Sequence, residues 1–256
     1  MGKIKLGLFL LIALLLFSFI FMGNEKIDTS SSLLPPSSSH PFGTDYLGRD
    51  LLSISSKGLL LSFFLSFLTS CCATIFALFF TFLNNTRYLF VISSSLIKTL
   101  KVIPSTIFAI FLVSIFGNGA EKIVISLSLV EGASLSVVLS SLIKRIKSEN
   151  YVVAARSAGL RESKIFFKHI IPSLLPYIKE NFAINMIRAI ISESSLSYLA
   201  IGVKPTTITL GAILKEGRAV ILSSPFVTFF PSLLLLLLTF SIFLISRGIS
   251  ELYSTS

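Results

Sequence analysis

Residues 148–176, SENYVVAARSAGLRESKIFFKHIIPSLLP, form a polar and basic segment in a chain that is otherwise mostly hydrocarbon. Of the 256 residues, 53% are hydrophobic and only 13% are charged, whereas a soluble domain carries about 25% charged residues. The deficit indicates an integral membrane protein. A basic segment between membrane spans is therefore expected to face water on one side of the bilayer, where a soluble partner can reach it.

The composition of this segment predicts two short helices joined by a hinge. Strong helix formers stand in its first half, at Ala154, Ala155 and Ala158. Gly159 offers the left-handed backbone that commonly ends a helix. A second helix is expected from about 161 to 171, where Pro172 stops it because proline lacks a backbone donor and clashes in a helix interior. Pro176 then opens the next span.

The second helix is expected to be amphipathic. Ile165, Phe166 and Ile170 can share an apolar face, and basic residues recur on another face at Arg161, Lys164 and Lys168. One interpretation is a hairpin that lies on anionic lipid. The other is a surface for a soluble partner. The small residues at 154, 155, 158 and 159 favour a partner, because they let another protein approach closely.

The net charge of +10 does not indicate nucleic-acid binding in this chain. Its 22 lysines and arginines follow the loops between apolar runs, not one helix face. Basic loops of this kind face the cytoplasm and anionic lipid. The sequence therefore predicts contact with membrane lipid and no nucleic-acid partner.

Six membrane spans are expected, because a spanning helix needs about 20 mostly apolar residues. Four runs are free of charge, and two more contain charged residues; in chain order the six are 6–24, 58–86, 102–120, 123–143, 181–201 and 219–246. Residues 88–101, with Lys98 and Lys101, are expected to form an amphipathic lead-in to the third span.

The first run is interpreted as an uncleaved span and not a signal peptide, because it is long and lacks a small-x-small cleavage site. With both termini inside, twelve lysines and arginines lie in inside segments and seven in outside segments. We therefore expect an N-in, C-in topology in the plasma (inner) membrane. The expected division is a first span with its outer segment, 1–57, and a membrane domain, 58–256.

The outer segment has two parts. TSSSLLPPSSSH at 29–40 is typical of an extended linker. HPFGTDYLGRDLLS at 40–53 predicts a turn that leads into a helix at the membrane surface. Its charged residues, Asp45, Arg49 and Asp50, are expected to hold the fold of the segment itself. The alternative is that they contact a protein docked on the outer side.

Three charged residues fall inside expected spans. Glu131 and Arg188 lie at similar depth in two antiparallel helices, where a charge is costly unless it is paired or faces a water-filled cavity. We hypothesise that they pair or line a translocation path. Glu193 lies nearer the outer face, and it either contacts the solute or marks the end of the hydrocarbon.

No catalytic or metal cluster is expected. Cys71 and Cys72 are adjacent packing residues, and the two histidines, His40 and His169, are assigned to opposite sides of the membrane. The chain has no GxxxxGK[ST] phosphate-binding loop, so it is expected to bind no nucleotide or other cofactor.

Three blocks in the right order, over roughly residues 40–256, resemble one family. AARSAG at 154–159 followed by HIIPSLLP at 169–176 is similar to the EAA loop of the membrane subunits of binding-protein-dependent ABC importers. HPFGTDYLGRDLLS and ESSLSYLAIGVKPTTITLGAILKEGR at 193–218 resemble the C-type permeases for dipeptides, oligopeptides and nickel. Val153 stands where the loop usually has a glutamate, and Leu210 where the family often has tryptophan.

The resemblance implies an all-α membrane domain of the type I importer fold. The chain would form half of a pore with a homologous permease subunit, above two ATPase subunits that bind ATP and Mg²⁺, and would receive solute from an extracytoplasmic binding protein. By resemblance, the ATPase-docking residues are Val153, Ala154, Ala155, Ala158, Gly159, His169 and Pro172. Peptides are the first expected solute and nickel chelates the second. An ATP-independent transporter and a membrane adaptor remain as alternatives.

Overall fold

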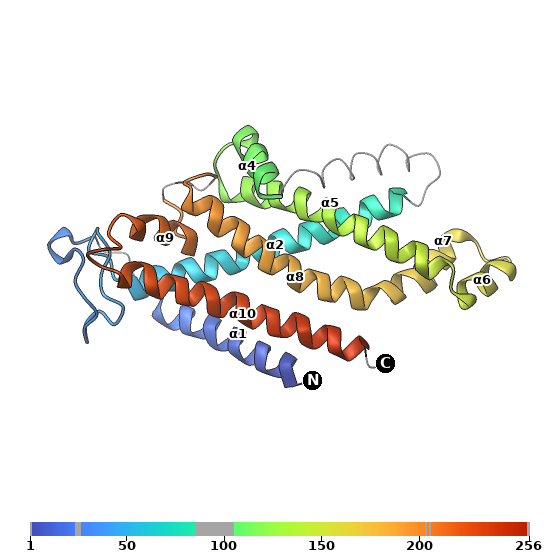
Figure 1. Cartoon of the computed structure of the whole chain (residues 1–256), viewed down its shortest axis with the longest axis horizontal. Helices are drawn as coiled ribbons and strands as arrows, with labels where there is room; N and C mark the ends of the chain where they lie inside the picture. Colours follow the sequence, from blue (N-terminus) through green and yellow to red (C-terminus); the bar gives the residue numbers. More distant parts are fainter. Residues whose placement is uncertain (1, 24–26, 85–104, 203, 205, 255–256) are drawn as a thin grey trace.

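The computed structural model describes residues 2–23, 27–84, 105–202, 204 and 206–254, and this part of the chain is helical (Figure 1). The long helices are α1 (Gly2–Phe21), α2 (Leu51–Asn84), α5 (Ala120–Lys147), α8 (Ile171–Tyr198) and α10 (Phe226–Ser254). The shorter elements are a 3-10 turn (Thr29–Ser31), α4 (Ser105–Phe116), α6 (Asn150–Ser157), α7 (Glu162–Ile165), the π-helical turn η2 (Phe166–Ile170) and α9 (Leu210–Arg218).

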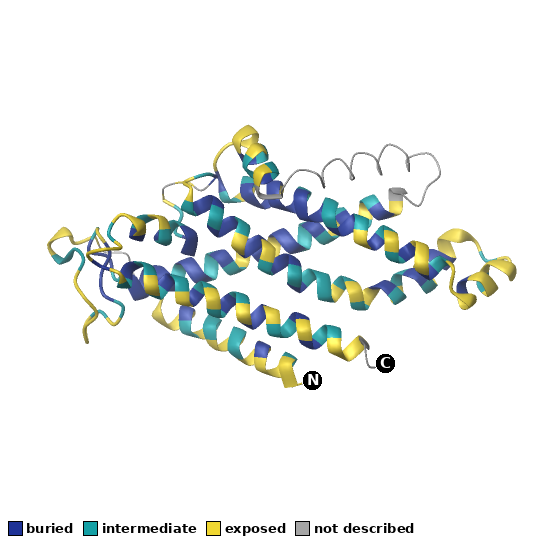
Figure 2. Cartoon of the chain, in the orientation of Figure 1, coloured by how far each residue is buried: buried dark blue, intermediate teal, exposed yellow. Residues whose placement is uncertain are grey.

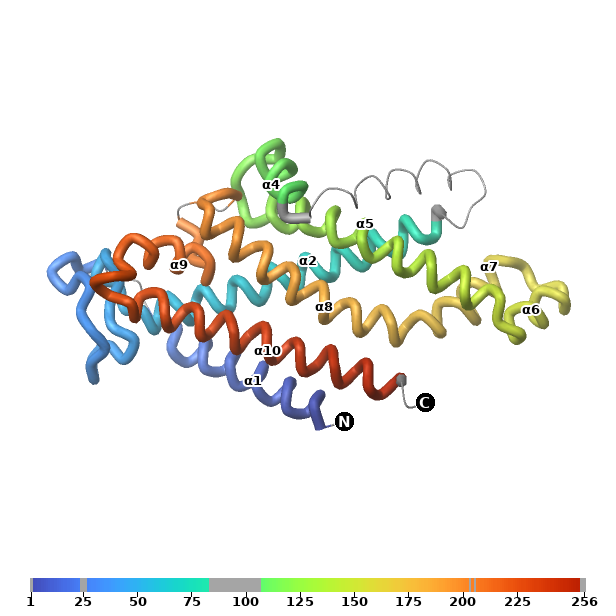
Figure 3. Tube along the Cα trace, viewed as in Figure 1, coloured from blue at the N-terminus to red at the C-terminus, as the bar shows by residue number. Residues whose placement is uncertain are grey.

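The long helices run along the long axis of the molecule and separate two polar ends (Figures 1 and 3). One end consists of α6 and α7. The other end holds the segment 28–50 and α9. The N-terminal end of α1 and the C-terminal end of α10 lie side by side and point toward the α6–α7 end. Lys3 pairs with Glu251 there.

Four described helices are long and apolar enough to cross a membrane: Gly2–Phe21, Leu51–Phe82, Ala120–Lys147 and Phe226–Tyr253. They correspond to the first, second, fourth and sixth expected spans. The helix α8 has the length for the fifth but not the apolar composition. For the third, α4 is apolar but has only 12 residues, and the predicted lead-in at 88–101 lies outside the described residues.

The core lies between α2, α5 and α8 (Figure 2). Gly132 of α5 allows a close crossing, since a Cβ atom there would lie 2.9 Å from the carbonyl oxygen of Ala73. The helix α1 packs on α10 outside this core, again through glycines. A Cβ atom on Gly7 would lie 2.8 Å from the carbonyl oxygen of Ser241, and one on Gly248 would lie 2.8 Å from the backbone nitrogen of Ile4.

Candidate coupling segment and polar clusters

The segment 148–176 begins with α6, and its end follows the prediction. Gly159 has φ +80°, in the left-handed region. Its backbone N–H donates to the carbonyl of Arg156 (3.0 Å), and that of Leu160 donates to the carbonyl of Ala155 (3.2 Å). These two bonds form a Schellman motif, which satisfies carbonyls at the helix end. The predicted helix end at Gly159 is therefore confirmed.

The predicted stop at Pro172 is wrong. The second helix continues from α7 through the π-helical turn into α8, and Pro172 lies in the first turn of α8. Pro176 also lies inside α8 and does not open it. A proline ring clashes with the carbonyl four residues earlier, which for Pro172 belongs to Lys168. Lys168 lies within the π-helical turn, whose wider spacing separates ring and carbonyl without ending the helix.

The predicted apolar face of the second helix is confirmed, and it faces protein. Ile165, Phe166 and Ile170 are 0%, 4% and 0% exposed. Together with Val152 of α6 they pack against Leu139, Ile143 and Ile146 of α5. The helical pair at the tip is thus joined to the core by buried side chains and not by a flexible linker.

The opposite face of α6 is open. Val153 is 46% exposed, Ala154, Ala158 and Gly159 are exposed, and Ala155 is half-buried. A Cβ atom on Gly159 would meet nothing within 4 Å. The predicted docking residues outside α6 lie nearby: His169 is half-buried, with its ring 6.3 Å from that of Tyr151, and Pro172 is exposed. The face therefore presents small side chains to solvent.

A salt bridge closes the turn between the two helices. Arg156 Nε donates to Glu162 Oε1 at 2.6 Å, and both side chains are about half exposed. The hydrogen bond from Arg156 lowers the pKa of Glu162 below its ordinary value. The exposed pair contributes little to stability, but it links α6 to α7 across Gly159.

Glu131 and Arg188 are brought together from α5 and α8. Arg188 Nη1 lies 3.5 Å from Glu131 Oε2. Their surroundings differ, because the Glu131 side chain is 5% exposed and that of Arg188 is 54% exposed. If α8 crosses the membrane as the fifth expected span, a half-exposed guanidinium there calls for a water-filled space or a polar partner beside it.

Glu193 is buried, with 1% exposure, and does not lie at an open outer surface. Its carboxylate accepts hydrogen bonds from Ser197 Oγ (2.7 Å), Ser62 Oγ (3.2 Å) and Ser194 Oγ (3.4 Å). Ser62 belongs to α2, and its Oγ accepts the backbone N–H of Leu210 at the start of α9 (3.3 Å). Glu193 thereby connects α8, α2 and α9. No sequence pattern predicts this network, since its members are up to 148 positions apart.

The segment 28–50 folds around Asp45, which is 1% exposed. Its Oδ1 accepts the backbone N–H groups of Leu47 (2.9 Å) and Arg49 (2.8 Å), and its Oδ2 accepts Arg49 Nε (2.6 Å). Asp50 Oδ2 lies 2.8 Å from His40 Nδ1. The expectation that Asp45, Arg49 and Asp50 hold this segment is confirmed.

Arg49 also reaches α9, which the sequence did not indicate. Its Nη2 donates to Glu216 Oε2 at 2.8 Å. Burial works to lower the pKa of Arg49, but the bonds to Asp45 and the charge of Glu216 outweigh it and raise the pKa. Burial raises the pKa of Glu216, and the charge of Arg49 opposes that shift without cancelling it. The guanidinium of Arg49 is thus shared by two carboxylates, those of Asp45 and Glu216.

Among the residues that the structure describes, no three His, Cys, Asp or Glu side chains form a group that could hold a metal ion. Cys71 and Cys72 are free thiols within α2. The chemistry of the described polar clusters is hydrogen bonding and ion pairing between helices.

Comparison with known proteins gives a consistent result. Residues 73–252 match the family described as the binding-protein-dependent transport system inner membrane component. The chain is 25% identical to the dipeptide transport system permease protein DppC of Alkalihalophilus pseudofirmus, over 98% of this chain and 83% of that protein. It is 24% identical to the oligopeptide permease OppC of Bacillus subtilis, over 96% of this chain and 83% of that protein. It is 28% identical to the glutathione permease GsiD of Escherichia coli, over 84% and 72%.

Solved structures support the fold. A chain in the structure titled "Inward facing conformations of the MetNI methionine ABC transporter" superposes with a TM-score of 0.62 at 16% identity, over 76% of this chain and 94% of that one. A chain of an amino acid ABC transporter gives a TM-score of 0.54 at 16% identity, over 79% and 92%. With its matching segment covering most of the chain, this inner-membrane protein belongs to the family of binding-protein-dependent transport system inner membrane components.

Proposed function

We propose that this chain is one of two permease subunits of an ATP-driven importer of short peptides. It crosses the membrane six times, with both termini in the cytoplasm, and forms half of the translocation path. Two separate ATPase subunits bind and hydrolyse ATP, and a binding protein delivers the solute from outside. Relatives named for dipeptide, oligopeptide and glutathione transport support a peptide-type solute.

The single observation that carries the proposal is the construction of the segment 148–176. Its inner face is buried against α5, and its outer face presents exposed small residues around Gly159. A Cβ atom on Gly159 would meet nothing within 4 Å, so another protein can approach this surface closely. The arrangement suits a helix that sits in a groove of another protein.

The same construction supports a mechanism. Closure of the ATPase pair on ATP would move α6, and the buried contacts would carry α5 and α8 with it as a rigid unit. Because α8 runs without a break from the π-helical turn to the Glu193 network, the movement reaches α9 at the far end. The path would thereby alternate between inward and outward access.

We further propose that Glu131 and Arg188 lie beside the translocation path. The exposed guanidinium of Arg188 is the supporting observation, because hydrocarbon is a costly environment for it. Glu131 neutralises this charge from the protein side at 3.5 Å. Glu193 lies near α9, where its hydrogen bonds connect helices, and we do not assign it a contact with the solute.

The test of the docking role is Gly159→Asp, with Gly117→Asp as the matched control. Both glycines have positive φ (+80° and +85°), and a Cβ atom on either would meet nothing within 4 Å. The two variants therefore share the backbone strain and the added charge, but Gly117 precedes α5 at the end far from α6.

We expect Gly159→Asp to insert into the membrane but to lose co-purification of the ATPase, while Gly117→Asp retains it. Normal co-purification with Gly159→Asp would overturn the docking role.

The solute is identified separately, by mass spectrometry of the ligand that the binding protein carries. A nickel chelate in place of a peptide would select the other branch of the family, and docking without solute flux would indicate an adaptor.

A further inference from the structure

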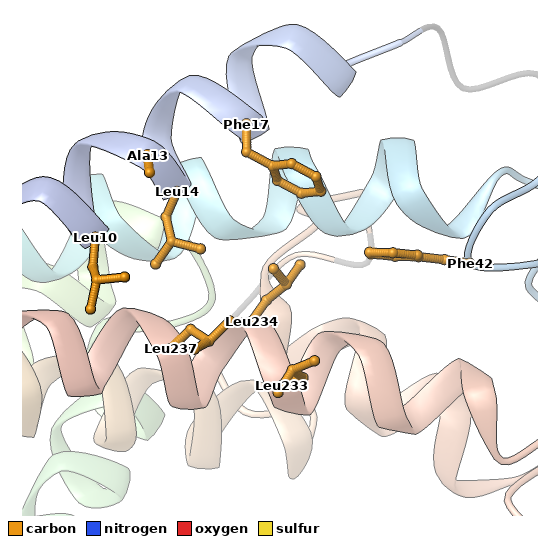
Figure 4. A pocket seen from close by; sticks show the side chains of 8 residues that line it. All are labelled: Leu10, Ala13, Leu14, Phe17, Phe42, Leu233, Leu234 and Leu237. Atoms are coloured by element: carbon orange, nitrogen blue, oxygen red, sulfur yellow. The ribbon is translucent and has the colours of Figure 1, made fainter.

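A cavity of about 390 Å³ lies between α1 and α10, outside the helical core (Figure 4). Leu10, Leu14 and Phe17 of α1 face Leu234 and Leu237 of α10 across it, and Phe42 closes the end near the segment 28–50. The eight described side chains that line it are all apolar. The volume falls within the range of roughly 300–1,000 Å³ that is typical of small-ligand sites.

The cavity results from how the two helices pack. Gly7 and Gly248 bring their backbones together near the chain termini. Beyond Gly7 toward the segment 28–50, leucine and phenylalanine side chains replace glycine and hold the backbones apart. The aromatic stack of Phe42 on Phe230, with ring centroids 4.1 Å apart, fixes the far end of the cavity.

The surroundings of these two helices indicate what fills the cavity. In the most apolar stretch of α1 only 11% of the residues are buried, and in the most apolar stretch of α10 only 28% are buried. The corresponding share in α5 is 67%. Their outer faces carry exposed phenylalanines, at Phe9, Phe19, Phe229, Phe240 and Phe243. For helices of spanning length, such a surface is bathed in lipid hydrocarbon. The cavity is continuous with that surface and has no polar group to hold water.

We propose that this cavity is a binding site for one acyl chain of a membrane phospholipid. The chain lies along the groove between α1 and α10 and contacts Leu14 and Leu234. Its headgroup lies at the end marked by Phe42, where the polar segment 28–50 meets the helices. The bound chain fills the space that the side chains lining the cavity leave open. The site is independent of which solute the protein carries.

The test uses the full chain, purified with its associated subunits and reconstituted in vesicles of phosphatidylethanolamine and phosphatidylglycerol. A small share of the phosphatidylethanolamine carries a photoreactive diazirine in one acyl chain. After illumination, adducts are mapped to residues by mass spectrometry. Contact with bulk lipid alone would label in proportion to exposure, so Phe19 (70% exposed) would be labelled and Leu234 (5% exposed) would not.

We expect strong labelling of Leu14 and Leu234 in the wild-type protein. Leu14→Trp fills the cavity and should abolish the adduct on Leu234, whereas Leu16→Trp, at a position 57% exposed, should leave it unchanged. The wild-type pattern is informative even if Leu14→Trp fails to fold. Labelling confined to exposed residues such as Phe19 would overturn the proposal.

A protein occupant is the competing outcome, because a helix of the second permease subunit could cover the groove. Benzoylphenylalanine at position 14 separates the two cases. Cross-linking to phospholipid adds the mass of one lipid and supports the proposal. Cross-linking to another subunit would overturn it.

Discussion

Asp45 is the residue on which the fold of the segment 28–50 depends most. It accepts three hydrogen bonds while 1% exposed, and one of them comes from the guanidinium of Arg49. Asp45→Asn removes the charge but keeps the shape, so Arg49 is left with Glu216 alone. We expect a loss of about 3 kcal/mol, as for a buried ion pair that loses one partner.

The measurement is the thermal stability of the purified protein, together with the rate at which protease cuts the segment 28–50. Asp28→Asn is the control. Asp28 caps the turn Thr29–Ser31 in an exposed position, and asparagine caps equally well. Equal behaviour of the two variants would contradict the role of Asp45.

Glu216 should make stability depend on pH. Burial raises its pKa in the folded protein above the ordinary value of 4.5. The Glu216 carboxyl is therefore more easily protonated in the folded than in the unfolded state. Its contribution to the stability of the folded state is fully present below about pH 4.5 and is lost as the pH rises through the raised pKa. Glu216→Gln removes this titration.

As the pH rises from below 4.5 to neutral, the wild type should lose stability that Glu216→Gln keeps. We therefore expect the melting temperature of the variant to rise relative to that of the wild type over this pH range. Glutamine can still accept a hydrogen bond from Arg49, so the variant tests the charge and not the contact. A difference that falls with rising pH would show that the ion pair with Arg49, and not burial, dominates at Glu216.

At the scale of elements, the packing of α1 on α10 rests on Gly7. A Cβ atom there would lie 2.8 Å from the carbonyl oxygen of Ser241 and 2.9 Å from the backbone nitrogen of Ile245. Backbone atoms cannot move aside as a flexible side chain can. We expect Gly7→Ile to cost about 1–3 kcal/mol by overpacking. Gly2→Ile, in the same helix with nothing within 4 Å, should change little; equal losses in thermal stability would argue against the close crossing.

Local patterns predicted the elements that local forces decide. The turn at Gly159 follows from the left-handed preference of glycine, and the buried face at Ile165, Phe166 and Ile170 follows from helical spacing. Pro172 was predicted wrongly, because the rule for proline assumes an ordinary α-helix and the π-helical turn before it removes the clash. No feature of the sequence announces such a turn.

At the scale of the whole molecule, the contacts that matter most join distant parts of the chain. Arg49 pairs with Glu216 across 167 positions, and Ser62 binds the start of α9 across 148. The sequence identifies Glu193 and Arg49 as charged residues but does not indicate which groups surround them. Partners so far apart along the chain come together only through the way the helices assemble. Glu131 and Arg188 could be matched in advance only because they were expected at similar depth in two antiparallel helices, and the structure brings them together from α5 and α8.

The Glu131–Arg188 contact leads to a prediction about transport. Glu131→Arg places two positive charges together, one of them buried, and should cost about 3 kcal/mol. Arg188→Glu opposes two carboxylates in the same place. We expect either single variant to lose most solute uptake, and the double exchange to recover part of it, because the pair is restored with its direction reversed.

Uptake of radiolabelled ligand by cells, normalised to the amount of permease in the membrane, measures this effect. Glu121→Arg is the matched control, since it makes the same charge change in α5 at an exposed position of the first turn. It should leave uptake unchanged. If the double exchange transports no better than either single variant, the two residues do not act as a pair, and the exposed guanidinium of Arg188 then has to be explained by a group on the second permease subunit.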